Sequence, residues 1–330
     1  MFARTRPLLA LAGLAALAAL AACEGGDSAL SPAGDPPAGS VENPIVDPAD
    51  TTEVSNQSLA SLTSPRIAFS SNLTGNGDIY LMDSYGKQLK RLTTFSSYEA
   101  SPAWSRDNKR IAMVRPRKDA SNVTHTDIYI INADGTNGHW WRSTPSPYNL
   151  NDPSWSPDGS NILVTVAANG TWFVAYLNLP GHYIGFFTDE TAHVVMGKEP
   201  SFNPTGDQIV YASSNRNTLQ VMAATGYQHK TLLYNPQSSI SRPVFSPDGK
   251  RIALSMTDTD GYLQIFVRNA DASLKRLTTT TNANMWPSWS PDGSKLVFRR
   301  ANQVWIMSAT GGSQTKLHVA SYDVSPAFSH

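Results

Sequence analysis

A short motif that recurs about every 45 residues constrains the fold of this 330-residue chain more than any other feature of its sequence. The motif is a proline, a small or β-branched residue, an aromatic residue, and a serine or asparagine. Its aromatic residue stands at six positions: Trp104, Trp155, Phe202, Phe245, Trp289 and Phe328. Periods of about 40 to 45 residues are typical of β-propellers, in which each repeat forms one four-stranded blade.

A tight turn follows the motif, and three copies of it read Ser-Pro-Asp-Gly, at residues 156–159, 246–249 and 290–293. Proline presets the first central position of such a turn, aspartate bonds its own backbone, and glycine accepts a positive φ. We therefore interpret the turn aspartates as structural, and we expect the aromatic residues before the turns to pack between blades. These aspartates are Asp158, Asp248 and Asp292.

The strands after the turn keep one order, as in Ile-Ala-Met-Val at 111–114 followed by Asp-Ile-Tyr at 127–129. Residues 66–69 read as a second strand with no first strand before them, whereas the last motif reads as a first strand with nothing after it. Three N-terminal strands and one C-terminal strand would complete one blade and remove its free edges. We predict an all-β, six-bladed β-propeller over residues 65–330, its ring closed by the C-terminal inner strand.

The N-terminus has a different composition. Residues 8–22 form an uncharged, Ala/Leu-rich run of 15 residues, which is short for a membrane span and typical of a signal peptide. The run ends in Leu-Ala-Ala-Cys, which resembles the lipobox of bacterial lipoproteins. We expect residues 1–22 to be a lipoprotein signal peptide and Cys23, the only cysteine of the chain, to carry a lipid anchor.

Charge separates the tether from the propeller. The whole chain carries 26 basic and 26 acidic residues, so no excess of positive charge points to nucleic acid. Residues 23–64, however, contain seven acidic residues and no Lys or Arg, among many Pro, Gly and Ser. We expect this segment to be a disordered acidic tether.

The order aromatic-Ser-Pro-Asp-Gly, Ile-Ala-Phe, Asp-Ile-Tyr, Leu-Thr resembles the WD40-like repeats of the TolB C-terminal propeller, over about residues 65–330. TolB carries an N-terminal α/β domain, and an anchor and tether stand in its place here, so the chain resembles a TolB-like lipoprotein. Similar propellers precede the hydrolase domain of prolyl oligopeptidases. No Gly-x-Ser-x-Gly nucleophile motif occurs in this chain, which excludes that class.

Propellers usually bind partners on the face opposite the Ser-Pro-Asp-Gly turns. We expect the residues just before the inner-strand prolines to approach the channel on that face: Glu99, Asp152, Glu199, Arg242, Trp286 and Asp323. A cationic cluster is expected on loops between second and third strands, as a binding patch or as a solubilising rim: Arg115, Arg117, Lys118, Arg216, Arg299 and Arg300.

The channel carboxylates have two interpretations. Three or four of them around one narrow channel can hold Ca²⁺, and simple pairing with neighbouring cations is the plainer alternative. The stretch Asp258–Gly261 also resembles part of a calcium loop, but it lacks the distal ligands. We predict no cofactor, with a channel-bound Ca²⁺ or Mg²⁺ as the alternative, and no metal site or catalytic residue is assigned.

Our leading functional prediction is a non-catalytic, monomeric lipoprotein whose propeller binds an envelope protein or polymer in the periplasm. Glu24 after the cysteine favours the outer membrane. One alternative is a carbohydrate-active enzyme similar to polysaccharide lyases, which requires His193, Glu199 and another histidine to converge with a metal. A second alternative is a sensor that binds a small ligand or a metal in the channel.

Overall fold

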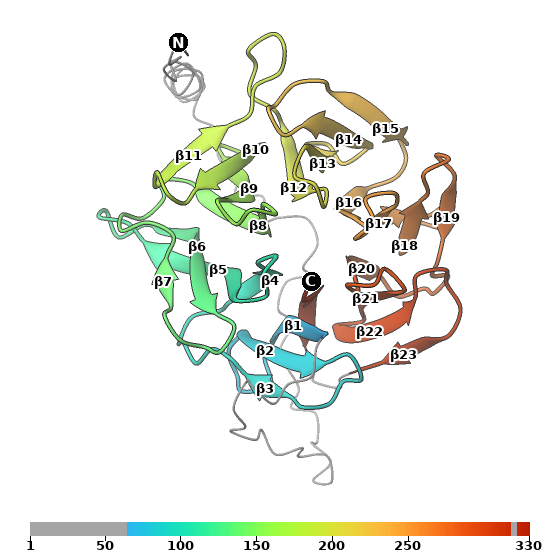
Figure 1. The fold of residues 1–330 in the computed structure, drawn as a ribbon, viewed down its shortest axis with the longest axis horizontal. Coiled ribbons are helices and arrows are strands. Elements are labelled where there is room, and N and C mark those ends of the chain that lie inside the picture. The colour runs from blue at the N-terminus through green and yellow to red at the C-terminus, as the bar shows by residue number, and fades with distance from the viewer. Residues whose placement is uncertain (1–64, 318–321) are drawn as a thin grey trace, which may run out of the picture.

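The computed structural model describes residues 65–317 and 322–330, which form six four-stranded antiparallel sheets arranged as a ring (Figure 1). The predicted six-bladed all-β propeller is confirmed. The predicted signal peptide, Cys23 and the acidic tether lie outside the described residues. No helix in the described part of the chain is long and apolar enough to cross a membrane.

Each blade begins with an inner strand at the channel and ends with an outer strand at the rim. Blade 1 contains β24 (Asp323–Phe328), β1 (Arg66–Ser71), β2 (Asp78–Asp83) and β3 (Lys90–Arg91). Blade 2 contains β4 (Ala100–Trp104), β5 (Arg110–Lys118), β6 (Thr124–Asn132) and β7 (His139–Trp140). Blade 3 contains β8 (Asn149–Trp155), β9 (Asn161–Ala168), β10 (Thr171–Asn178) and β11 (Tyr183–Phe186).

The remaining blades follow in chain order around the ring. Blade 4 contains β12 (Gly197–Phe202), β13 (Gln208–Ser213), β14 (Thr218–Ala223) and β15 (Lys230–Tyr234). Blade 5 contains β16 (Ile240–Phe245), β17 (Ile252–Thr257), β18 (Leu263–Arg268) and β19 (Leu274–Arg276). Blade 6 contains β20 (Asn284–Trp289), β21 (Lys295–Arg300), β22 (Gln303–Ser308) and β23 (Gln314–Lys316).

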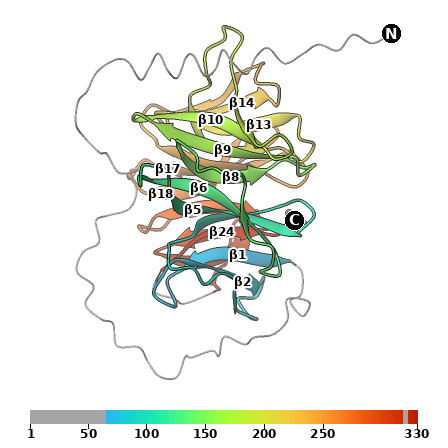
Figure 2. The ribbon, with the colours of Figure 1, turned by 90° about the vertical axis from the view of Figure 1, so that its left-hand side faces the viewer.

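Blade 1 closes the ring, because its inner strand β24 comes from the C-terminus and pairs with β1 (Figure 2). The Arg66 N–H donates to Ser329 Oγ over 2.9 Å, and the Ser329 N–H donates back to the Arg66 carbonyl over 2.8 Å. The last residue is tied to the next blade, since the His330 N–H donates to Asn108 Oδ1 over 2.7 Å. The first and last strands of the described residues thus belong to one sheet.

The motif tryptophans join neighbouring blades, as the sequence predicted. Trp155 of blade 3 is buried, and its indole N–H donates to the Ala103 carbonyl of blade 2 over 3.1 Å. The Arg110 guanidinium, also of blade 2, lies 4.4 Å from the centre of the Trp155 ring. Trp104 and Trp289 repeat both contacts with the blade before them. Each tryptophan is therefore clamped by the preceding blade through a hydrogen bond and a cation–π contact.

The Ser-Pro-Asp-Gly turns are held by their own aspartates. Asp158 Oδ1 accepts the Ser156 hydroxyl over 2.5 Å and the Ser160 N–H over 3.0 Å. These hydrogen bonds lower the pKa of Asp158 below its usual value, and the bond from the Ser156 hydroxyl has the largest effect. The interpretation of these aspartates as turn formers is confirmed for this turn and for the matching contacts of Asp248 and Asp292.

Candidate functional site

A central channel of about 350 Å³ runs between the six inner strands. One end opens on the face where the inner strands begin, which we call the mouth face. The other end opens on the face of the Ser-Pro-Asp-Gly turns, which we call the turn face, and Arg106 and His330 lie there. The lining includes the six motif prolines: Pro102, Pro153, Pro200, Pro243, Pro287 and Pro326.

The residue immediately before each of these prolines adopts a left-handed backbone conformation. All six have φ between +50° and +56°, and each sits in an irregularity of the pairing between the first and second strands. They are Ser101, Asp152, Glu199, Arg242, Trp286 and Ser325. Such a conformation is strained for residues other than glycine, by about 1 kcal/mol or more. The six bulges place side chains of five kinds in the channel lining near its mouth.

Two residues predicted for this ring lie elsewhere. Glu99 and Asp323 stand three residues before their prolines, so Ser101 and Ser325 occupy the equivalent positions. Glu99 is fully buried, and the Thr93 hydroxyl donates to its Oε2 over 3.1 Å. Burial raises the pKa of Glu99 above its usual value. Counting back from each proline would have found the two serines, which the sequence analysis missed.

The backbone N–H groups of two bulges bond to a side-chain hydroxyl of the preceding blade. The Glu199 N–H donates to Thr165 Oγ1 over 2.8 Å, and the Trp286 N–H donates to Ser255 Oγ over 3.2 Å. Thr165 and Ser255 occupy the same place in their blades, opposite the residue just before the bulge. In blade 4 this place is taken by Ala212, which has no hydroxyl.

Glu199 compensates for that missing hydroxyl. Its Oε2 accepts the Arg242 N–H over 2.7 Å, and its two carboxylate oxygens also accept the Arg216 guanidinium over 3.1 and 3.0 Å. Burial alone would raise the pKa of Glu199, but the charges of Arg216 and Arg242 outweigh burial and hold it below the usual value. Glu199 is therefore an ionised and fully bonded structural carboxylate.

Arg242 extends this group of charges to blade 3. Its Nη2 lies 2.6 Å from Asp152 Oδ1, and its Nε lies 3.5 Å from Glu199 Oε1. We call Asp152, Glu199, Arg216 and Arg242 the charged mouth. It joins blades 3, 4 and 5, and of the channel carboxylates expected to hold Ca²⁺, Asp152 and Glu199 are both neutralised there by arginine.

Trp286 continues the mouth into blade 6. Its ring lies between two guanidiniums, with Arg242 at 5.5 Å and Arg299 at 4.7 Å from the ring centre. Arg299 also lies 5.6 Å from the ring centre of Tyr322. This alternation of arginine and aromatic side chains gives the mouth a half-buried, partly apolar edge beside its charged part.

The expected cationic cluster on loops is wrong in its placement, because the strands continue further than predicted. β5 runs through Lys118, which pairs with Thr124 of β6. Arg115 lies over the Phe95 ring at 3.5 Å, and its Nε is 3.4 Å from Glu99 Oε1. The expected cations therefore lie in three separate blades. Most of them form ion pairs or hydrogen bonds with residues of the same blade.

The other residues of the expected cationic cluster are also spread over the ring. Arg117 lies 3.5 Å from Asp127, within blade 2. Arg300 is a buried residue of β21 that donates to Asn284 Oδ1 over 2.7 Å. Arg216 stands in the loop between β13 and β14 and belongs to the charged mouth. Lys118, in contrast, is exposed at the end of its strand.

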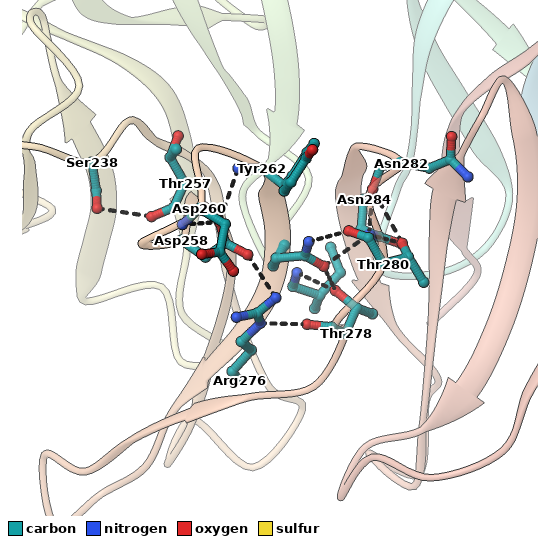
Figure 3. Close-up of polar contacts among 12 residues, drawn as sticks. Ser238, Thr257, Asp258, Asp260, Tyr262, Arg276, Thr278, Thr280, Asn282 and Asn284 are labelled. Carbon is teal, nitrogen blue, oxygen red and sulfur yellow. Dashed lines mark hydrogen bonds and ion pairs between the residues drawn. The ribbon is translucent and has the colours of Figure 1, made fainter.

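The stretch that resembled a calcium loop is a closed turn (Figure 3). Asp258 Oδ1 accepts the backbone N–H groups of Asp260 and Tyr262, over 3.0 and 2.9 Å. Asp258 Oδ2 lies 2.6 Å from the Arg276 guanidinium. The aspartate that would lead a calcium loop is thus used to close the turn and to pair with the outer strand. Among residues 65–317 and 322–330, no three His, Cys, Asp or Glu side chains gather to hold a metal.

The histidine and glutamate of the predicted lyase-like site do not meet. His193 has an 81% exposed side chain in the loop between β11 and β12, which projects outward from the ring in Figure 1. Its Nδ1 bonds to Thr191, whereas Glu199 is bonded within the charged mouth. Of the histidines in the described residues, His330 alone lines the channel, at its turn-face end.

The six blades, each built from a WD40-like repeat, define this protein as a β-propeller of the kind found in TolB. The family model "TolB beta propeller domain" matches residues 59–243 and 225–330. The chain therefore belongs to the TolB beta-propeller domain family.

Individual relatives agree with this assignment. The chain is 27% identical over 230 residues to the Tol-Pal system protein TolB of Francisella tularensis, covering 62% of this chain and 48% of that protein. It is also 27% identical over 169 residues to the uncharacterized peptidase YuxL of Bacillus subtilis, covering 48% of this chain and 22% of that protein. The chain spans less than half the length of these curated relatives.

Solved structures share the fold. TolB from Acinetobacter baumannii matches with a TM-score of 0.68 at 24% identity, covering 81% of this chain and 67% of that chain. Oligogalacturonate lyase from Vibrio parahaemolyticus matches with a TM-score of 0.50 at 11% identity, covering 76% of this chain and 73% of that chain. At these identities the similarity shows the fold alone.

Proposed function

We propose that this propeller is a non-catalytic module that binds an envelope protein or polymer at its mouth face. The convergence of Asp152, Glu199, Arg216 and Arg242 from three blades, beside Trp286, carries the proposal. Charged groups fix the register of a partner, and a half-buried aromatic ring provides contact area. The family's TolB members, named for the Tol-Pal system, support a protein partner in the cell envelope.

A matched pair of variants tests this proposal. Trp286→Ser replaces the mouth tryptophan by the residue that blades 1 and 2 carry at the equivalent position, so the backbone bulge has precedents in the same ring. Tyr85→Ser removes a 73% exposed tyrosine from the turn face. We expect Trp286→Ser to reduce capture of envelope components by the chain from residue 65 at least tenfold.

The control and the analysis of the captured material decide the outcome. Tyr85→Ser should capture as much as the wild-type chain. Treatment of the extract with protease or with a muramidase then separates a protein partner from a polymer partner. Equal capture by the wild type and Trp286→Ser would show that the mouth is not the binding surface.

We also propose that residues 1–22 act as a signal peptide, that Cys23 carries the lipid anchor, and that residues 23–64 are the tether of a monomeric propeller. The position of the cysteine directly after the apolar run supports lipidation. Glu24, directly after the cysteine, supports anchorage in the outer membrane with the propeller in the periplasm. A Cys23→Ala chain that still fractionates with membranes would contradict the lipid anchor as the cause.

A further inference from the structure

Lys198 adds a positive charge that the charged mouth does not balance. The mouth itself is neutral, since its two arginines pair with its two carboxylates. Lys198 stands on β12 beside Glu199, and its Nζ lies 3.4 Å from the centre of the Trp172 ring of blade 3. Among the described residues, no carboxylate lies within ion-pair distance of this ammonium. Its three N–H donors therefore meet only the face of an aromatic ring there.

The carboxylates of the mouth are already engaged by other donors. Asp152 Oδ1 lies 2.6 Å from an Arg242 nitrogen, and Asp152 Oδ2 accepts the Thr165 hydroxyl over 2.8 Å. Glu199 accepts three hydrogen bonds from the two arginines of the mouth. Neither carboxylate can neutralise Lys198 without losing one of these contacts.

Arg216 brings further unused donors close to Lys198. Lys198 pairs in register with Ala212 of β13, and Arg216 stands in the loop that follows β13. Arg216 gives one N–H from each of its two terminal nitrogens to Glu199, out of the five N–H groups of a guanidinium. Burial lowers the pKa of Lys198 most, and the charge of Arg216 lowers it further. Two cations that repel each other and retain donors can share one anionic group.

The surface around Lys198 contains apolar side chains of the kind found in protein interfaces. Met196 has a 57% exposed surface and forms a β-bridge with Phe173 of blade 3. Residues two apart on an extended segment point to the same side, so Met196 borders Lys198. Methionine and aromatic residues are enriched in protein–protein interfaces. One face of Trp172, in contrast, is covered by Lys198, which removes a flat surface on which a sugar ring could stack.

We propose that these four residues, Trp172, Met196, Lys198 and Arg216, bind a carboxylate from an acidic, partly apolar segment of a partner protein. We call them the cationic edge. The carboxylate accepts N–H groups of Lys198 and Arg216, and an apolar side chain next to it covers Met196. This inference rests on the proposed binding function of the mouth face and names the chemistry of the partner. An anion at this place balances the one cation beside the mouth that the described fold leaves without a carboxylate.

Two labelled synthetic peptides test the cationic edge on the full-length chain. In one peptide glutamate alternates with leucine, and in the other glutamine replaces every glutamate. We expect fluorescence anisotropy to show at least about fivefold tighter binding of the glutamate peptide, weakening as salt rises. Lys198→Met should weaken binding of the glutamate peptide by about fivefold and leave binding of the glutamine peptide unchanged.

Two control variants separate charge from packing and from position. Lys198→Arg keeps the positive charge and should keep the preference for the glutamate peptide. Lys250→Met removes an exposed lysine from the turn face and should leave binding of both peptides unchanged. Methionine retains an unbranched apolar stem against Trp172, so the melting temperature of Lys198→Met should equal that of the wild type.

Three results would overturn the inference. One is equal affinity of the wild-type chain for the two peptides, and another is unchanged binding of the glutamate peptide by Lys198→Met. The third is tighter binding of an oligogalacturonate than of the glutamate peptide, lost in Lys198→Met, because the carboxylate would then belong to a polysaccharide. If Trp286→Ser loses capture while Lys198→Met keeps binding the glutamate peptide, the proposed function stands and this inference alone fails.

Discussion

The two ends of the inner strands differ in what the six blades repeat. At the turn end side chains also recur: the motif has an aromatic residue in all six blades, and the Ser-Pro-Asp-Gly turn occurs in blades 3, 5 and 6. At the mouth end they repeat only the backbone. The left-handed bulge occurs six times, but it carries serine twice and Asp, Glu, Arg and Trp once each.

This difference separates the residues that close the ring from those that are available to specify a partner. A repeated side chain is required where each blade must fit the next one in the same way. A repeated bulge with variable side chains lets every blade present a different group to the channel without altering the ring. Asp152, Glu199 and Arg242 of the charged mouth stand at such variable positions. One of them, Glu199, also stabilises the fold, because it accepts the Arg242 N–H.

The largest effect is expected at the turn end. Trp155→Ala removes a buried ring, its hydrogen bond to Ala103 and its contact with Arg110, and we expect a loss of about 3 to 5 kcal/mol in the free energy of unfolding. Urea denaturation measures this loss. Trp155→Phe, which copies the residue of blades 4 and 5, should lose about 1 kcal/mol for the hydrogen bond. Equal losses in both variants would contradict the clamp.

A smaller effect is expected at the mouth. Glu199→Ala leaves the Arg242 N–H without its acceptor and Arg216 without its partner, and we expect a loss of about 2 kcal/mol. Adding Ala212→Ser to this variant supplies the hydroxyl that blades 3 and 5 have at this position, and should restore about 1 kcal/mol. In the wild-type background Ala212→Ser should give no gain. A gain of equal size in both backgrounds would contradict the compensation by Glu199.

The turn end should also show a pH dependence. Hydrogen bonds from the Ser290 hydroxyl and then from Ser294 lower the pKa of Asp292 to about 2, from a usual value of 3.8. A carboxyl whose pKa is lowered by folding stabilises the protein above the unfolded value, and the stabilisation is lost as the pH falls through the folded value. We therefore expect unfolding midpoints to fall between about pH 4 and pH 2, and to fall less in Asp292→Asn. Identical pH profiles would contradict this assignment.

The smallest effect is expected for the bulge itself. Ser101→Gly relieves a φ of +50° but adds freedom to the unfolded chain, so we expect the free energy of unfolding to change by less than about 0.5 kcal/mol. Ser101→Val should instead destabilise by more than about 1 kcal/mol, because a β-branched residue tolerates this conformation poorly. A valine accepted without loss would mean that the bulge relaxes to an extended conformation.

The ring could be predicted from the sequence because its determinants are local and periodic. The motif spacing sets the number of blades, and the incomplete units at the two ends indicate the composite blade. The aromatic residues at Trp104 and Trp155 were correctly placed between blades, because an aromatic residue recurs at the same place in every repeat.

The mouth could not be predicted in the same way, because its geometry depends on neighbouring blades. The residue before a proline normally favours an extended backbone, yet Glu199 is held in a left-handed bulge and its N–H bonds to Thr165 of another blade. The sequence suggested that Arg115 is a cation available for binding. In the fold its guanidinium packs on the Phe95 ring and pairs with Glu99. Such partners are distant in the sequence, so no local pattern identifies them.

Because blade 1 joins the first and last strands of the described propeller, the point where the propeller begins is interchangeable with other points on the ring. Pro65 and His330 line the same hollow beside the Ser290–Asp292 turn, so a short linker could connect them. New ends could then be opened in an exposed loop of another blade, such as the projecting loop around His193. A circularly permuted propeller of this kind would keep every blade intact and would leave the mouth at the same place relative to the ring.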